Sequence, residues 1–222
     1  MRTAGAGTLY VVATPIGNLD DLSQRARTIL SEADWIACED TRRTRKLLNH
    51  FAIATATVSY HEHNEEERAA ELLDRLIGGD TIALVSDAGT PLVSDPGYRL
   101  VRRCHECGVP VIPVPGPSAA VAALSVSGLP SDRFLFVGFL PKKAAARREE
   151  LLQIASVSAT LILYLPPHRL ARSLLEIEEA LGDREAFLIR EMTKLHETSL
   201  RGSLSEIRAQ ASLEAARGEY TL

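Results

Sequence analysis

The sequence predicts an α/β protein made of two α/β subdomains, and two features of the chain lead to this class. Short apolar runs alternate with helix-periodic segments from Leu9 to Ile112, a pattern typical of parallel strands joined by helices. The pattern breaks at Gly128-Leu129-Pro130-Ser131-Asp132, and strand-like runs resume beyond it. We therefore expect a first subdomain over residues 1–127 and a second over residues 128–222.

The first subdomain should contain five strands, each a short apolar run between polar segments. They are Leu9 to Ala13, Trp35 to Cys38, Ala56 to Ser59, Ile82 to Val85 and Val109 to Ile112. Helices are expected between them, because apolar residues recur there at helical spacing. One helix should begin at Asn64, a good N-cap followed by three glutamates, and end at Gly78-Gly79.

The second subdomain should continue the same alternation. Its expected strands are Phe134 to Val137, Thr160 to Leu165 and Ala186 to Ile189. Pro166-Pro167 should open a helix that Gly182 closes. Ser203 and Glu206 have the spacing of a capping box at the start of another helix. The last residues, Gly218 to Leu222, have the pattern of a beginning strand.

The composition is ordinary for a soluble globular protein, since 45% of the 222 residues are hydrophobic and 24% are charged. No apolar run approaches the roughly 20 residues that span a bilayer, and the polar start is unlike a secretory signal. We therefore expect a cytoplasmic protein. The three cysteines argue against a disulfide framework. Cys104 and Cys107 have the spacing of half a metal site, but no second pair completes it, so no metal is expected.

Three loops rich in small residues follow strands of the first subdomain. They are Ala13 to Asn18, Ser86 to Gly97 and Pro113 to Ala119. Ligands of parallel α/β sheets bind at the carboxyl ends of the strands, where these loops begin. Glycine lets the backbone approach a ligand closely, and Asp87 adds a carboxylate. The three loops together predict the rim of one pocket.

Several other kinds of site are excluded by their missing signatures. No G-x-G-x-x-G opens a helix, and no G-x-x-x-x-G-K-[ST] is present, so the dinucleotide and nucleoside triphosphate loops are absent. Ser86 lacks the flanking glycines of a hydrolase nucleophile. Asp87 and Asp95 could suggest a metal pair, but no third hard ligand stands at a fixed spacing.

The loop sequences T-P-I-G-N-L, S-D-A-G-T-P and P-G-P-S-A, in this order, resemble the tetrapyrrole methylase superfamily, the class III methyltransferases that use S-adenosylmethionine. Further segments narrow the resemblance to the branch that methylates a cytidine 2′-hydroxyl in 16S ribosomal RNA. They are Glu39 to Arg42, His61 to Asn64, Gly138 to Pro141 and Arg190 to Lys194. The resemblance runs from about Thr8 to the last residue.

The resemblance implies that S-adenosylmethionine binds in a cleft between the two subdomains of a homodimer. The residues it assigns to this cofactor are Pro15, Asp87, Ala88, Gly89, Val93, Ser94, Ser118, Ala119, Leu165 and Met192. Val93 and Ser94 are expected at the start of the following helix. In the resembling family the chain continues beyond Leu222, so we expect the last strand to be truncated, with contacts near Thr221 incomplete.

Methyl transfer to a hydroxyl needs a group that removes its proton. The candidates are Glu39, Asp40, His61, Glu62 and His63. Asp40 has the position of an ordinary helix N-cap. Glu39 ends an apolar strand and needs a partner, either Arg42 or Arg190. We take Glu39, Arg42 and His61 as the catalytic candidates.

RNA is the expected substrate, in the form of 16S ribosomal RNA or the small ribosomal subunit. The net charge of −4 gives no global attraction to nucleic acid, so RNA binding would need local basic clusters. Two clusters supply the candidates Arg43, Arg45, Lys142 and Arg147. The alternative for both clusters is a solvated helix face.

Three other functions stay open at this stage. The first is a tetrapyrrole or diphthine methyltransferase of the same fold, which the basic clusters disfavour. The second is a non-catalytic RNA-binding assembly factor with a degenerate pocket, which the intact loops disfavour. A nucleotide-dependent oxidoreductase ranks last, because its phosphate-binding fingerprint is missing.

Overall fold

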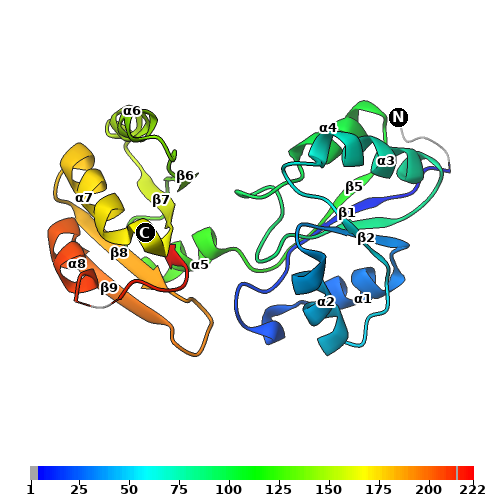
Figure 1. The fold of residues 1–222 in the computed structure, drawn as a ribbon, viewed down its shortest axis with the longest axis horizontal. Coiled ribbons are helices and arrows are strands. Elements are labelled where there is room, and N and C mark those ends of the chain that lie inside the picture. Colours follow the sequence, from blue (N-terminus) through cyan, green and yellow to red (C-terminus); the bar gives the residue numbers. More distant parts are fainter. Residues whose placement is uncertain (1–4, 214) are drawn as a thin grey trace. The chain divides into compact units, whose positions relative to one another are not determined.

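The computed structural model describes residues 5–213 and 215–222 of the chain. These residues form two compact units, one ending at Ser118 and the other beginning at Ala119, and each unit has its own sheet (Figure 1). The predicted class, two α/β subdomains, is confirmed. The sequence-based boundary at residue 128 falls after α5 (Ala119–Ser127), whereas this helix groups with the second unit.

The first unit contains a parallel sheet with the strand order β3-β2-β4-β1-β5. Its strands are β1 (Leu9–Val12), β2 (Trp35–Cys38), β3 (Thr57–Ser59), β4 (Ile82–Leu84) and β5 (Val111–Val114). All five occur where apolar runs predicted them, although β5 starts two residues late and includes Pro113. Proline is tolerated there because β5 is an edge strand, where one backbone donor fewer costs little.

Helices cover both faces of this sheet (Figure 1). They are α1 (Gln24–Glu32), α2 (Thr41–His50), α3 (Glu65–Ile77) and α4 (Tyr98–Glu106), with a short 3-10 turn, η1 (Leu19–Asp21). One apolar cluster joins α1 and α2 to the sheet, and a second joins α3 and α4 to it. Neighbouring residues of one strand, such as Ile82 and Ala83, belong to opposite clusters. Burial on both faces explains why the strands are continuous apolar runs.

Asn64 occupies the predicted N-cap position of α3, but its side chain bonds elsewhere. Its Oδ1 accepts a hydrogen bond from the His61 amide at 2.8 Å, and its Nδ2 donates to the Ser59 carbonyl at 3.2 Å. The residue therefore closes the turn between β3 and α3 instead of capping the helix. This turn fixes the place of His61 beside the end of the strand.

The second unit contains a mixed sheet with the order β6-β7-β10-β8-β9. Its strands are β6 (Phe134–Phe139), β7 (Thr160–Leu165), β8 (Glu185–Arg190), β9 (Thr198–Ser203) and β10 (Tyr220–Thr221). The expected closing strand is present as β10, which pairs antiparallel with both β7 and β8. The edge strand β9 was not predicted, because its sequence T-S-L-R-G-S has no apolar alternation.

Helices α6 (Ala144–Ile154), α7 (Leu170–Leu181) and α8 (Leu204–Ala211) share one core with this sheet. The predicted helix after Pro166 is a 3-10 turn, η2 (Pro167–Arg169), followed by α7, and Gly182 caps α7 as expected. The capping box of Ser203 and Glu206 at α8 is confirmed. In the described parts of the chain, no helix combines the length and the apolarity needed to cross a bilayer.

Arg147 does not lie on a solvated face of α6, so its prediction as an RNA contact is wrong. Its side chain is only 3% exposed. The guanidinium forms a two-pronged ion pair with Glu176 on α7 and donates to the carbonyls of Pro141 and Lys142, both at 3.0 Å. A guanidinium whose donors are used inside the protein cannot bind a phosphate. Arg147 instead holds the segment before α6, through the Pro141 and Lys142 carbonyls, to Glu176 on α7.

Replacing Arg147 with alanine should therefore destabilise the protein by about 3 kcal/mol, because Glu176 and two carbonyls lose their shared partner. The exposed neighbour Arg148 supplies a matched control, and Arg148→Ala should change stability by less than about 0.5 kcal/mol. Urea unfolding curves of both variants measure the difference. Equal stability of the two variants would contradict the buried role of Arg147.

Candidate functional site

The three small-residue loops of the first unit are joined to one another by hydrogen bonds. Thr14, after β1, and Gly89, after β4, exchange two backbone hydrogen bonds of 2.9 and 3.0 Å. Thr90 donates from its hydroxyl to the Pro117 carbonyl at 3.0 Å and so ties in the loop after β5. Because β4 and β5 both flank β1, the three loops leave the sheet at one edge. The expected rim is thus a single connected surface.

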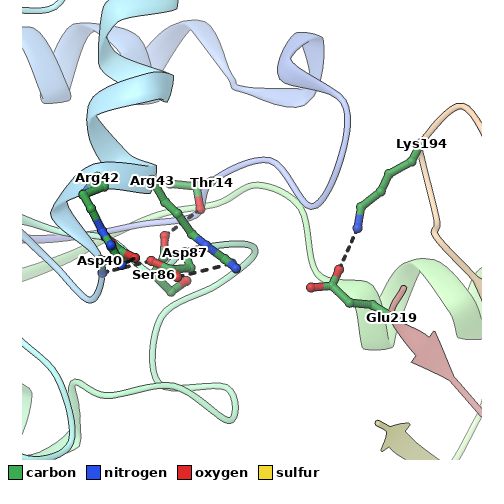
Figure 2. A network of polar contacts seen from close by, with 8 residues as sticks. All are labelled: Thr14, Asp40, Arg42, Arg43, Ser86, Asp87, Lys194 and Glu219. Carbon is green, nitrogen blue, oxygen red and sulfur yellow. Dashed lines mark hydrogen bonds and ion pairs between the residues drawn. The ribbon is translucent and has the colours of Figure 1, made fainter. Parts of the chain in front are cut away.

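Two buried hydroxyl groups, those of Thr14 and Ser86, stabilise the loop that follows β4. The Thr14 hydroxyl donates to the Ser86 carbonyl at 3.1 Å (Figure 2). The Ser86 hydroxyl donates to the Gly89 carbonyl at 3.2 Å. Both side chains are almost fully buried. Gly89 has a φ of +88°, a conformation that side chains disfavour, while a Cβ there would meet ordinary contact distances. The glycine therefore serves the backbone conformation of the loop.

Asp87 joins the ends of two neighbouring strands. Its Oδ1 accepts a hydrogen bond from the Asp40 amide at 3.0 Å, and its Oδ2 lies 3.4 Å from the Arg43 guanidinium (Figure 2). Asp40 follows β2 and Asp87 follows β4, and these strands are adjacent in the sheet. The half-buried carboxylate thus joins the loops that follow β2 and β4, and it remains partly exposed to solvent.

Asp40 and Arg42 form a pair of their own at the start of α2. Asp40 caps the helix by accepting from the Arg42 amide at 2.8 Å, as predicted. The Arg42 guanidinium contacts the same carboxylate and holds the pKa of Asp40 well below its usual range. The expectation that Arg42 partners Glu39 is therefore wrong, because the helix start turns its side chain toward the capping residue.

Glu39 lies in an acidic part of the site, with Asp87 and Asp95 nearby. Burial, followed by the charge of Asp87, raises the pKa of Glu39, while Arg43 and His61 act in the opposite direction. Burial also raises the pKa of Asp95 to about 6, although a hydrogen bond with Ser86 opposes the shift. Carboxylates in such surroundings hold protons more tightly than in water, which suits proton transfer near neutral pH.

His61 stands close enough to Glu39 to affect its ionisation. Its Nδ1 is buried and has no hydrogen-bond partner among the described residues. The ring lies 6.0 Å from that of His63, centroid to centroid, while the side chains of Glu62 and His63 are exposed. Of the three predicted residues in this segment, the structure thus brings only His61 beside the carboxylates.

Val93 and Ser94 do not lie at the start of a helix, because α4 begins only at Tyr98. They belong to an irregular loop in which Leu92 and Ser94 have φ values of 72° and 66°. A Cβ at Gly97 would lie 2.7 Å from Leu92. No sequence pattern signalled this left-handed backbone. The loop carries Asp95 back toward Ser86.

The predicted cofactor residues of the second unit also meet at one sheet edge. Tyr220 of β10 pairs with Leu165 at the end of β7 and with Arg190 at the end of β8. The Leu165 side chain belongs to the core, so only its backbone is available for binding. Met192 is half-buried in the turn that follows β8.

The remaining candidates take simple positions. Pro15 is buried, Ala88 is exposed, Ser118 precedes α5 and Ala119 is its first residue. Of the RNA candidates, Arg43 pairs with Asp87, while Arg45 and Lys142 are exposed. A groove of about 310 Å³ in the second unit is lined mainly by apolar residues, including Leu161, Phe187 and Leu222, and by none of the predicted site residues.

The architecture and the connected loops are those of a methylase, and the chain belongs to the Tetrapyrrole (Corrin/Porphyrin) Methylases, whose family model matches residues 8–208. Within this family it is similar to the Ribosomal RNA small subunit methyltransferase I of Vibrio cholerae, with 55% identity over 204 residues, 91% of this chain and 71% of that protein. The protein of the same name from Halalkalibacterium halodurans is 54% identical and covers 97% of this chain and 75% of its own length.

Solved structures share the fold at much lower identity. Uroporphyrin-III C-methyl transferase from Thermus thermophilus, complexed with S-adenyl homocysteine, has a TM-score of 0.68 at 21% identity and covers 97% of this chain and 96% of its own. Diphthine synthase has a TM-score of 0.71 at 16% identity, covering 97% and 89%. These likenesses confirm the predicted fold.

Two functional features were missed from the sequence. Thr14 joins the loops after β1 and β4, but a threonine before a proline carries no such signal. Asp95 was considered only as part of a metal pair, while the structure places it near Glu39 and Asp87. Its burial depends on the left-handed loop, which only the folded chain shows.

Asp95→Asn should make stability less dependent on pH. A carboxyl whose pKa is raised to about 6 holds its proton in the folded state, so wild-type stability falls as pH rises from about 4 through about 6. The variant should be more stable than wild type at pH 7.5, by on the order of 1 kcal/mol after allowance for partial exposure, and equal to it near pH 4. Urea unfolding across this range measures the effect.

Asp183→Asn is the control, because the pKa of Asp183 is lowered and the change in stability should have the opposite sign. Hydrogen bonds from Ser205 lower the pKa of Asp183, so this variant should be less stable than wild type at pH 7.5, and the gap should close as pH falls below 4. A constant stability difference for Asp95→Asn across the whole pH range would refute the assignment.

Proposed function

We propose that this chain transfers a methyl group from S-adenosylmethionine to the 2′-hydroxyl of a cytidine in 16S ribosomal RNA. The observation that carries the proposal is the 55% identity, over nine-tenths of the chain, with a protein named Ribosomal RNA small subunit methyltransferase I. The connected loops after β1, β4 and β5 support it, because they keep the small residues and the carboxylate that a methyl donor needs.

The residues of the first unit fit the polar parts of S-adenosylmethionine. The donor carries hydroxyl, amino and carboxylate groups and a sulfonium centre, and it supplies the methyl group when bound. Asp87 keeps part of its carboxylate exposed, and Ala88 is exposed beside it. We assign Pro15, Asp87, Ala88, Gly89 and Ser118 to this binding role, together with Val93, Ser94 and Ala119, the first residue of the second unit.

In the second unit we assign the donor-binding role to the backbone at Leu165 and around Met192. Leu165 is the last residue of β7 and Met192 follows β8, and these two strands end at the same edge of the sheet. Met192 is half-buried, so part of the residue packs against the protein and part remains accessible to a ligand.

Glu39 is the group we propose as the base. An ionised carboxylate that burial makes more basic accepts a hydroxyl proton more readily than a fully hydrated one. Arg43, rather than Arg42, opposes that upward shift of the Glu39 pKa and so favours the ionised form of the carboxylate. His61 lies beside it and can share the proton or orient the carboxylate. Arg42 would contribute only through Asp40, at the start of α2.

For the RNA itself we propose Arg45 and Lys142 as phosphate contacts, since both side chains are exposed. Arg43 can contribute in addition to its pairing with Asp87, because its side chain is 65% exposed. The same proposal includes a homodimer and a cytoplasmic location, where small ribosomal subunits occur. A tetrapyrrole or diphthine methyltransferase is the alternative, supported by the fold alone at 16–21% identity.

The protein, incubated with labelled S-adenosylmethionine and small ribosomal subunits from a strain that lacks the enzyme, should label 16S RNA at one cytidine. Mapping by primer extension at low nucleotide concentration should show a 2′-O-methyl stop. Subunits from the wild-type strain are the control and should accept little label. Labelling of a tetrapyrrole or of protein instead of RNA would favour the alternatives, and binding of RNA without methyl transfer would favour an assembly factor.

Glu39→Gln should keep the fold and donor binding but slow single-turnover methyl transfer by at least about a hundredfold, the low end for loss of a base. The wild-type rate should show an acidic limb above the usual glutamate range, because the pKa of Glu39 is raised, and the variant should lack it. Glu62→Gln, an exposed neighbouring change, is the control. If the rate at saturating RNA is unchanged, Glu39 organises RNA binding, and His61 becomes the candidate base.

A further inference from the structure

The turn after β8 contains two residues in a strained backbone conformation. Glu191 has a φ of 51° and Thr193 a φ of 66°, and Met192 lies between them. Left-handed backbone is uncommon for residues other than glycine and is an outlier for a β-branched residue such as threonine. Such strain persists only where the surrounding structure holds it. The question is therefore which contacts hold this turn.

The Glu191 carboxylate is the centre of those contacts. Its Oε1 accepts hydrogen bonds from the Lys194 Nζ at 2.9 Å and from the Glu219 amide at 3.0 Å. The Glu191 amide in turn donates to the Glu219 carbonyl at 2.9 Å. Lys194 also contacts the Glu219 carboxylate at 2.9 Å (Figure 2). Lys194 lowers the pKa of Glu191, which keeps this carboxylate charged at neutral pH.

Gly218 makes room for the same carboxylate. It has a φ of +79°, and a Cβ added there would clash with the Cδ and Oε1 atoms of Glu191. A side chain at residue 218 would therefore displace the Glu191 carboxylate from its contacts. Glu191, Lys194, Gly218 and Glu219 form what we call the β8 clamp.

A turn that merely connects β8 to β9 does not need two left-handed residues around a methionine. The clamp holds this conformation at the sheet edge where β7 and β8 both end. We propose that Glu191 and Lys194 are positioning residues, which keep the backbone around Met192 in the conformation that binds the methyl donor. This inference rests on the proposed function, because it takes Met192 as a donor contact.

The physical reason is preorganisation. In the folded chain the clamp compensates for the strain before any ligand arrives. Without the clamp the turn relaxes to an ordinary conformation, and only the fraction of molecules in the strained conformation can bind. Apparent affinity then falls by that fraction, whereas the rate of the bound complex changes little. A clamp that served stability alone would not change affinity at a temperature where the protein stays folded.

The test compares Gly218→Ala with Gly182→Ala. Gly182 has nearly the same φ, +78°, but a Cβ there meets nothing within 4 Å. The two variants thus share the cost of a side chain at a positive φ, and only Gly218→Ala displaces the Glu191 carboxylate. Calorimetric titration with S-adenosylhomocysteine should show a Kd at least about tenfold higher for Gly218→Ala and a Kd near wild type for Gly182→Ala. The KM for S-adenosylmethionine should rise with it, with kcat nearly unchanged.

Lys194→Gln provides a second measurement that does not depend on the folding of Gly218→Ala, because Lys194 is partly exposed and removing its charge leaves the glycine intact. It should weaken binding in the same direction, and Lys194→Arg should restore most of the affinity. Wild-type affinity in both Gly218→Ala and Lys194→Gln would overturn the inference alone. A wild-type chain that fails to bind S-adenosylhomocysteine would overturn the proposed function itself.

Discussion

The two backbone hydrogen bonds between Thr14 and Gly89 connect the loops after β1 and β4, and the arrangement of the candidate site depends on them. They hold the β4 loop so that Asp87 reaches the Asp40 amide at the end of β2. That contact keeps Glu39 and Asp87 near each other, and the charge of Asp87 adds to burial, which is the larger cause, in raising the pKa of Glu39. One pair of hydrogen bonds thus links the loop conformation to the proton affinity of the proposed base.

Most of the strands, the three loops and the helix caps could be predicted from the sequence, because they depend on local contacts or on a periodic pattern of apolar residues. Buried parallel strands are continuous apolar runs, so all five strands of the first unit were found. The loops follow these strands directly, and parallel topology brings them to one edge. The Asp40 cap and the Ser203 capping box depend on residues within one helical turn, so their spacing was sufficient.

The remainder depended on contacts between residues far apart in the chain. Arg147 looks like a surface cation in a basic segment, and only the packing of α6 on α7 shows that Glu176 covers it. Arg42 could pair with either of two adjacent carboxylates, and the helix start selected Asp40. The positions of Val93 and Ser94 followed from a left-handed loop, and β9 has no apolar pattern because it lies at an edge. Ion pairs between distant residues, left-handed loops and polar edge strands produce no recognisable pattern in the amino-acid sequence.

The position of β1 in its sheet bears on how the first unit is made. Both hydrogen-bonding neighbours of β1, β4 and β5, follow it by many residues in the chain. During synthesis, this apolar strand leaves the ribosome long before either neighbour exists. The nascent chain therefore exposes an unpaired, aggregation-prone segment until β4 emerges. Its assembly is governed by distant pairings, which form slowly, and chaperones that shield apolar segments should matter most in this interval.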